Sequence, residues 1–199
     1  MKLRFSSEKV EQEFRNTPRK ICIATHTMPF LDIFTIYWSS TCWRELETKI
    51  YVSENSWYLP SWCIPIRKGG FIGQEIERLS ALPEFCHILF PSGGTIVWKT
   101  GFYILARETD AKIVVLGIDY VRREIVVDSI LSPISKSWQE IKQTAIQRLR
   151  TYPVRYECMF FLQSLGIPYG CETFPISRRS IWMARGLFFL CLFIYYIKN

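Results

Sequence analysis

Short, continuously apolar segments alternate with amphipathic ones along this chain, and that alternation constrains its fold more than any other feature. Lys112–Asp119 and Cys86–Phe90 have the length and composition of buried strands. Between them, Trp98–Thr109 repeats its apolar residues at helical spacing. Strands that alternate with helices predict an α/β fold, here a single domain with a mixed, mostly covered sheet flanked by helices.

The remaining expected elements continue this alternation. Further strands are expected at Lys20–Thr25, Lys49–Ser53, Trp62–Ile66 and Glu124–Ile130, and further helices at Leu31–Glu45, Gly73–Leu82 and Ser135–Leu149. Ile76 and Leu79 share one face of their helix, and Ser137 and Glu140 have the spacing of a capping box. Met1–Lys20 is charged throughout and lacks the apolar core of a secretory signal.

The last quarter of the chain differs in composition from the rest. From Arg148 onward there are seven basic and two acidic residues, so this stretch carries +5 of the net charge of +7. The apolar run Gly186–Ile197 would form a helix roughly 18 Å long, against a hydrocarbon core of about 30 Å. We predict an interfacial or partly inserted apolar anchor at about 181–197, within an extension at 151–199 that follows a core at 1–150. A full membrane span and a buried terminal helix are the alternatives.

The totals also exclude several classes of protein. With 49% hydrophobic and 22% charged residues, the chain is too apolar to be disordered. Its seven cysteines form no CxxC pair and several lie in apolar runs, which predicts buried free thiols in a reducing compartment. Two histidines without ligand spacing argue against a zinc site. Because the positive charge lies beside an apolar run, we expect membrane lipids as partners and no nucleic acid.

The first candidate site is a histidine between an expected strand and an expected helix, in Thr25–Asp32 (THTMPFLD). Ligands of open α/β sheets bind beyond the carboxyl ends of strands, and His26 could take a proton from a hydroxyl there. Asp32 could orient the ring and stabilise the imidazolium. The simpler alternative is that His26 ends a strand and Asp32 caps a helix. His87, in the middle of a strand, is better explained by packing.

The second candidate site is a turn of small residues between a strand and a helix, Phe90–Thr95 (FPSGGT). Paired glycines let a backbone approach an anion closely. Hydroxyls flank the glycines, and a lysine lies about one helical turn further on. The alternative is an ordinary strand–helix turn. The candidate ligands for a substrate phosphate are Ser92, Gly93, Gly94, Thr95 and Lys99.

A third segment, Ile64–Gly70, ends an expected strand with two cations and two glycines. Arg67 could form bidentate hydrogen bonds to a phosphate, because its guanidinium presents two parallel donors. A solvated turn is the alternative. Each of the three segments is weak evidence alone, and their order along the chain is more specific.

In that order and spacing, the chain resembles the PlsC-like family of glycerol-phosphate and lysophosphatidate acyltransferases, and its compact members most of all. The resemblance covers roughly 20–127 and is most specific in Trp98–Tyr103 (WKTGFY) and Gly117–Tyr120 (GIDY). The chain departs from the family pattern twice. Five residues separate His26 from Asp32 where the family has four, and the glutamate of the family's FPEGT turn is missing.

The resemblance implies a mechanism and partners. His26 would deprotonate an acceptor hydroxyl, with Asp32 orienting it, and the alkoxide would attack the thioester of an acyl-CoA or acyl carrier protein. Arg67, Lys99 and the glycine turn would hold an acceptor phosphate. No metal or other cofactor is expected, and the site would face the cytosol at a membrane. A catalytically silent lipid-binding protein and an acyltransferase with a non-phosphate acceptor are alternatives, and the oligomeric state is unknown.

Overall fold

The structure is a computed structural model, and it describes residues 2–24, 36, 48–53, 63–66, 72–91, 98–119, 122 and 124–152. By its contacts the chain divides into two units, Met1–Tyr169 and Gly170–Asn199. All of the described residues belong to the first unit. The predicted division into 1–150 and 151–199 stays a prediction.

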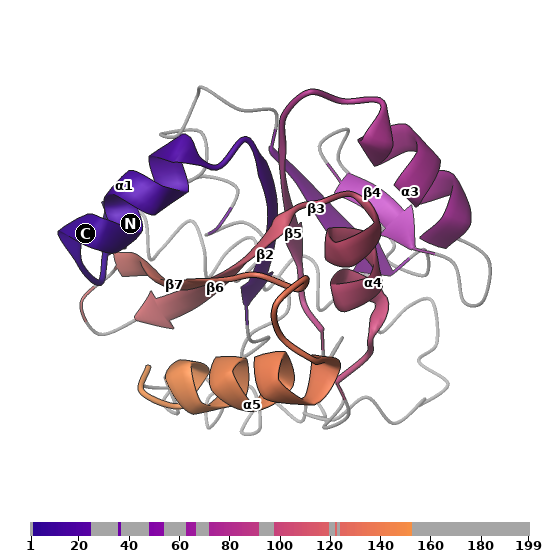
Figure 1. The fold of residues 1–199 in the computed structure, drawn as a ribbon. Coiled ribbons are helices and arrows are strands. Elements are labelled where there is room, and N and C mark those ends of the chain that lie inside the picture. Colours follow the sequence, from indigo (N-terminus) through magenta and orange to yellow (C-terminus); the bar gives the residue numbers. More distant parts are fainter. Residues whose placement is uncertain are drawn as a thin grey trace, which may run out of the picture. The chain divides into compact units, whose positions relative to one another are not determined.

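A seven-stranded mixed sheet forms the centre of the described part (Figure 1). Its strands run in the spatial order β1-β7-β6-β2-β5-β3-β4. The five strands from β6 to β4 are parallel to one another, β7 is antiparallel to β6, and β1 is parallel to β7. The strands are β1 (Lys2–Phe5), β2 (Arg19–Ala24), β3 (Thr48–Ser53), β4 (Cys63–Ile66), β5 (Phe85–Leu89), β6 (Lys112–Asp119) and β7 (Glu124–Leu131).

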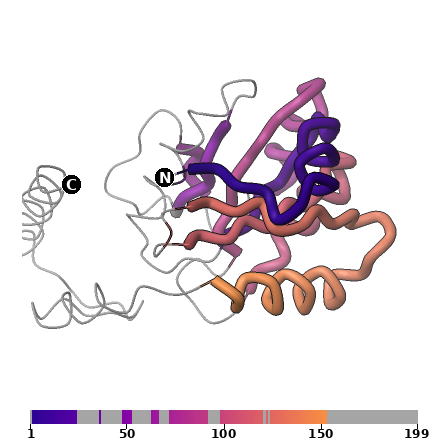
Figure 2. Tube along the Cα trace, turned by 90° about the vertical axis from the view of Figure 1, so that its left-hand side faces the viewer, coloured from indigo at the N-terminus to yellow at the C-terminus, as the bar shows by residue number. Residues whose placement is uncertain are grey.

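Helices cover both faces of this sheet. One face packs against α3, α4 and α5, and the other packs against α1. In Figure 2, α1 in indigo and α5 in orange lie on opposite sides of the strands. The mixed α/β fold with a covered sheet, expected from the alternation of the sequence, is therefore confirmed for this part of the chain. The described helices are α1 (Glu8–Asn16), α3 (Ile72–Ser80), α4 (Gly101–Glu108) and α5 (Trp138–Leu149).

The predicted elements between Gly73 and Leu149 agree with the structure to within three residues at each end. On α3, Leu79 is fully buried and Ile76 packs against the same cluster, as their spacing predicts. The capping box at the start of α5 is also confirmed. The amide of Glu140 donates to Oγ of Ser137 at 3.4 Å, and the amide of Ser137 donates to Oε2 of Glu140 at 2.7 Å.

Two N-terminal elements, β1 and α1, were not indicated by the sequence pattern. β1 lies at one edge of the sheet and is half exposed, so it lacks a continuous apolar run. In α1, Phe14 is the one buried residue, and its ring lies 5.5 Å from that of Phe5. A local signal was present, because the side chain of Ser7 caps α1 by accepting from the amide of Val10.

Several predicted elements lie outside the described residues. The predicted helix Leu31–Glu45 is described at Ile36 alone, which is helical and fully buried. The extension 151–199 is described only at Thr151 and Tyr152, and its apolar helix at 181–197 not at all. Among the described helices, none has both the length and the apolar composition needed to cross a membrane.

Candidate functional site

The carboxyl ends of five parallel strands lie along one edge of the sheet, because β6, β2, β5, β3 and β4 run in the same direction. In open α/β sheets this is the edge where ligands bind. The three sequence motifs come directly after three of these ends. His26 is two residues after the end of β2, Arg67 is one residue after the end of β4, and Ser92 is three residues after the end of β5.

The predicted site residues themselves are described in one case, Lys99. The structure therefore gives the positions of the strands and helices that lead to the motifs, and of the described residues on them. Those that lie outside the described residues are His26, Asp32, Arg67, Ser92, Gly93, Gly94 and Thr95.

The histidine motif and the glycine turn follow neighbouring strands. β2 and β5 pair in parallel, with Ile23 opposite Leu89. His26 and Ser92 are each three residues beyond these partners in the sequence. Since paired strands are about 4.8 Å apart, the two motifs begin from adjacent points at the same edge.

The glycine turn is closed at its base by a backbone hydrogen bond. The amide of Lys99 donates to the carbonyl of Pro91 at 3.0 Å, so the two ends of the segment 92–98 are held together. The side chain of Lys99 is exposed to solvent. The ring of Trp98 packs edge-on against Phe102 at 6.0 Å, which fixes this end of the turn to α4. An exposed lysine therefore lies at the C-terminal end of the predicted phosphate-binding turn.

The basic segment after β4 leads to a helix that begins beside the end of this turn. A Cβ built on Gly101 would lie 3.7 Å from Cδ1 of Ile72, an ordinary van der Waals contact. The first residues of α3 and α4 are therefore neighbours. Ile72 is five residues after Arg67, and Gly101 is two residues after Lys99. Two of the predicted cations are therefore within five residues, along the sequence, of this contact.

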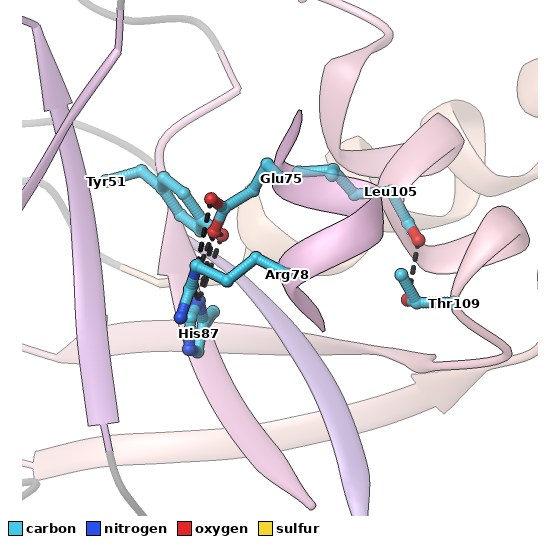
Figure 3. A network of polar contacts seen from close by, with 6 residues as sticks. All are labelled: Tyr51, Glu75, Arg78, His87, Leu105 and Thr109. Carbon is cyan, nitrogen blue, oxygen red and sulfur yellow. Dashed lines mark hydrogen bonds and ion pairs between the residues drawn. The ribbon is translucent and has the colours of Figure 1, made fainter. Parts of the chain in front are cut away.

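A buried polar network, which the sequence did not reveal, lies under α3 (Figure 3). The hydroxyl of Tyr51 on β3 donates to Oε1 of Glu75 on α3. Arg78 donates to the same carboxylate from Nε at 3.0 Å and from Nη2 at 2.5 Å. Nδ1 of His87 on β5 lies 2.9 Å from Oη of Tyr51. Tyr51, Glu75 and His87 are 2%, 4% and 1% exposed, so these polar groups satisfy one another in the core.

The direction of each hydrogen bond in the network follows from the number of protons available. Tyr51 has one hydroxyl proton and gives it to Glu75. Its oxygen must then accept from His87, so Nδ1 of His87 carries a proton. Nη2 of Arg78, 3.5 Å from that nitrogen, consequently has its acceptor in Glu75 and not in His87. The chain runs from His87 through Tyr51 to the carboxylate.

Electrostatics keep this carboxylate charged. Burial raises the pKa of Glu75, but the hydrogen bonds from Arg78 and Tyr51 outweigh burial and leave that pKa below its ordinary value of 4.5. Burial, followed by the hydrogen bond to Glu75, raises the pKa of Tyr51 well above its ordinary value. At neutral pH the network therefore holds an ionised Glu75 and a neutral Tyr51. The expectation that His87 is a packed core residue is confirmed.

Signals for this network were only partly present in the sequence. Glu75 and Arg78 have the i, i+3 spacing of a helical ion pair. Tyr51, the partner of Glu75, is 24 residues away in the sequence, and Tyr51 is 36 residues from its own partner His87. No local pattern gives these pairings. The network could only be found once the strand order was known.

Other polar groups in the described part lie apart from this network. Asp119, 6% exposed, ends β6 at the carboxyl edge, and its Oδ1 accepts from the amide of Arg122 at 2.9 Å.

Cys22 and Cys86 are buried free thiols, as predicted, with their Sγ atoms 3.6 Å apart. Burial lowers the pKa of Lys20, whose Nζ lies 4.7 Å from the ring centre of Phe14. Within the described ranges, no three His, Cys, Asp or Glu side chains are placed to hold a metal ion.

The described sheet thus has, at one edge, the strand ends that precede a histidine, an arginine and a glycine turn in the sequence. Comparison with family models, with curated proteins and with solved structures gave no match to this chain.

Proposed function

We propose that this chain is an O-acyltransferase that moves a fatty acyl group from an acyl thioester to a hydroxyl of a glycerolipid-type acceptor. The acceptor would be lysophosphatidate or glycerol phosphate. The observation that supports this most is the strand order. It places the strand ends that precede His26, Arg67 and Ser92 along one edge of the sheet. A motif after β7 or β1 would have emerged at the opposite edge, because these two strands run antiparallel to the other five.

In the proposed reaction, His26 takes the proton from the acceptor hydroxyl. The oxygen attacks the thioester carbonyl and the C–S bond breaks. The leaving sulfur takes the proton from His26 and departs as a thiol. Asp32 orients the imidazole and stabilises its charged form. The products are an ester and a free thiol, so no oxidant or reductant is consumed. General base catalysis of this kind contributes about 10²–10⁴-fold to the rate.

The acceptor phosphate would be bound by the cations and the glycine turn. The exposed side chain of Lys99 and the closed base of the turn support a binding site for an anion at this point. Arg67 would supply bidentate donors from the adjacent segment, five residues before Ile72. The missing glutamate removes a negative charge from the turn and leaves more positive potential for a phosphate.

A fatty acyl thioester and lysophosphatidate are both amphiphiles, so we place the enzyme at a membrane surface with its site open to a reducing compartment. The apolar run at 181–197 would anchor it there. Deleting Gly186–Asn199 should release the protein from membranes. Flotation of the truncated chain with liposomes, at the same level as the full chain, would contradict the anchor.

The experiment that tests the activity incubates purified protein in detergent with labelled acyl-CoA and a panel of acceptors. Transfer to lysophosphatidate or glycerol phosphate supports the proposal. Transfer only to acceptors without phosphate, such as a sterol or a monoacylglycerol, supports the alternative with a different acceptor. Retention of lipid without any transfer supports the catalytically silent alternative.

A further inference from the structure

The outermost strand β1 has a free backbone edge. β1 pairs with β7 on one side and ends the described sheet on the other. The amide of Ser6, directly after β1, donates to the carbonyl of Val127 on β7 at 3.0 Å. Because the backbone groups of successive residues point to opposite sides of a strand, those of Arg4 face β7 as well. The amides and carbonyls of Leu3 and Phe5 therefore face away from β7, where no strand of the described part pairs with them.

A groove of about 580 Å³ lies along this edge, between β1 and α1. In Figure 2 both elements are indigo, and β1 leads directly into α1. An added strand would lie about 4.8 Å beyond β1, so its side chains on the α1 side would enter this groove. The β1 side of the groove is lined by Leu3, Arg4 and Phe5, and the α1 side includes the charged residues Glu8, Glu11 and Arg15.

The two faces of β1 differ in chemistry. The side chains of Leu3 and Phe5 pack against the cluster that contains Phe14 of α1, and each is half-buried. Since side chains alternate along a strand, Lys2 and Arg4 point to the opposite face, and both are exposed. An added strand would thus meet apolar side chains on one face and cations on the other.

The cations of β1 are only partly neutralised. Nε of Arg4 lies 2.9 Å from Oε2 of Glu124 on β7. Within the ranges that the structure describes, Lys2 has no ion pair. This face of the edge therefore has an excess positive charge beside the position of an added strand, and opposite charges on adjacent strands stabilise their pairing.

The charges on the groove side are compensated within α1. Nη2 of Arg15 lies 2.8 Å from Oε1 of Glu11. Glu8 lies in the first turn of α1, where the helix dipole stabilises a negative charge. The groove itself therefore favours apolar side chains, which would cover Leu3 and Phe5.

A second copy of the chain fits this edge poorly. An antiparallel pairing of two β1 strands that uses all of the outward groups places Leu3 of each copy opposite Phe5 of the other. Arg4 of one copy then lies directly opposite Arg4 of the other, and like charges at such positions destabilise a strand pair. A register with Leu3 opposite Leu3 brings Arg4 opposite Lys2 and uses fewer of the outward groups. The edge therefore favours a strand of opposite charge over a second copy.

We propose that β1 binds an extended segment of another protein by strand addition, and that this segment has an acidic residue between two apolar ones. The outward groups of Leu3 and Phe5 bond to its backbone. Its apolar side chains enter the groove beside α1, and its acid lies beside Lys2 and Arg4. In this mode of recognition the backbone bonds supply affinity and the alternate side chains supply specificity. The proposal does not depend on acyl transfer, because β1 lies outside the five parallel strands that include those preceding the motifs.

The experiment measures the Kd of the full chain, in neutral detergent, for labelled peptides by fluorescence anisotropy. One peptide alternates valine with glutamate, and its match alternates valine with lysine. The glutamate peptide should bind more tightly by about fivefold at low salt, and added salt should reduce this preference. A glutamate peptide with methylated backbone nitrogens lacks the amide donors and should not bind measurably.

Leu3→Pro and Leu3→Ala are a matched pair of variants. Both lose packing of the leucine side chain, but only proline removes the outward amide, in an orientation that edge strands tolerate. Leu3→Pro should raise the Kd for the glutamate peptide by about threefold to tenfold more than Leu3→Ala, the usual effect of one hydrogen bond. Lys2→Glu should raise the same Kd by about twofold to fivefold and lower that of the lysine peptide. Urea titration checks that each variant is folded.

Several results would overturn the proposal. They are no binding of the glutamate peptide by the wild type, equal Kd values for the two charged peptides, undiminished binding of the methylated peptide, and equal effects of Leu3→Pro and Leu3→Ala. Self-association of the wild type that Leu3→Pro abolishes would assign the edge to a second copy instead. If Leu3→Pro does not fold, the methylated peptide tests the same backbone bonds.

Discussion

The ring of Tyr152 lies directly against Gly117 in β6, so close that a side chain at position 117 would overlap it. The hydroxyl of Tyr152 is held by Asp128 on the neighbouring strand β7. Gly117 therefore allows the end of the described chain to lie flat on the sheet. This close contact is a physical reason for a glycine at position 117.

Gly117→Ala should destabilise the protein by about 1–3 kcal/mol, the usual cost of forcing extra atoms into a packed site. The measurement is the free energy of unfolding from urea titration. Gly73→Ala is the control, because nothing lies within 4 Å of a Cβ at that helical position. It should stabilise the chain by about 0.5–1 kcal/mol. Equal effects of the two substitutions would show that Tyr152 does not occupy the space above Gly117.

Tyr51→Phe should cost about 1–3 kcal/mol of unfolding free energy, since it leaves a buried carboxylate and a buried ring nitrogen each short of one partner. Tyr103→Phe is the comparison, because the hydroxyl of Tyr103 makes only long bonds of 3.3 and 3.5 Å to backbone carbonyls. Its removal should change the same free energy by about 0.5 kcal/mol or less. A Tyr51→Phe variant as stable as Tyr103→Phe would refute the network.

Glu75 should make the stability of the protein depend on acid pH. Its pKa in the folded chain lies below the ordinary value of 4.5, so the folded state binds fewer protons than the unfolded state as pH falls through this range. The contribution of Glu75 is present above about pH 4.5 and is lost as the pH drops toward the folded pKa. Unfolding of the wild type and of Glu75→Gln, followed from pH 7 to pH 3, measures this difference. A stability gap that stayed constant or widened toward pH 3 would contradict the ionised, paired carboxylate.

How much of the fold could be predicted from the sequence depended on burial. β2, β5 and β6 are buried along nearly their whole length, so their sequences are continuously apolar and were recognised. β1 is an edge strand with alternating exposure, and α1 buries Phe14 alone, so neither has a strong apolar pattern. The return of β1 to the outer side of β7 depends on a pairing across more than a hundred residues, which no local pattern encodes.

In the candidate site, too, the local features could be predicted from the sequence and the long-range pairings could not. The residue types and their places after strands were readable from the sequence, because a strand end followed by glycines or a histidine is a local pattern. The strand order was not readable, and it is the order that makes β2 and β5 neighbours and gives three motifs a common edge. The partners of Glu75 were hidden for the same reason, since Tyr51 and His87 come from separate strands.

Acyl transfer by the His26→Ala variant is the most direct measurement of whether His26 acts as the base in the proposed reaction. The variant and the wild type are compared with labelled acyl-CoA and lysophosphatidate, after urea titration has shown equal free energies of unfolding. We expect the variant to lose transfer by at least about 10²-fold while its Kd for lysophosphatidate stays within twofold of the wild-type value. A correctly folded His26→Ala protein that retained near-normal transfer would contradict the assignment.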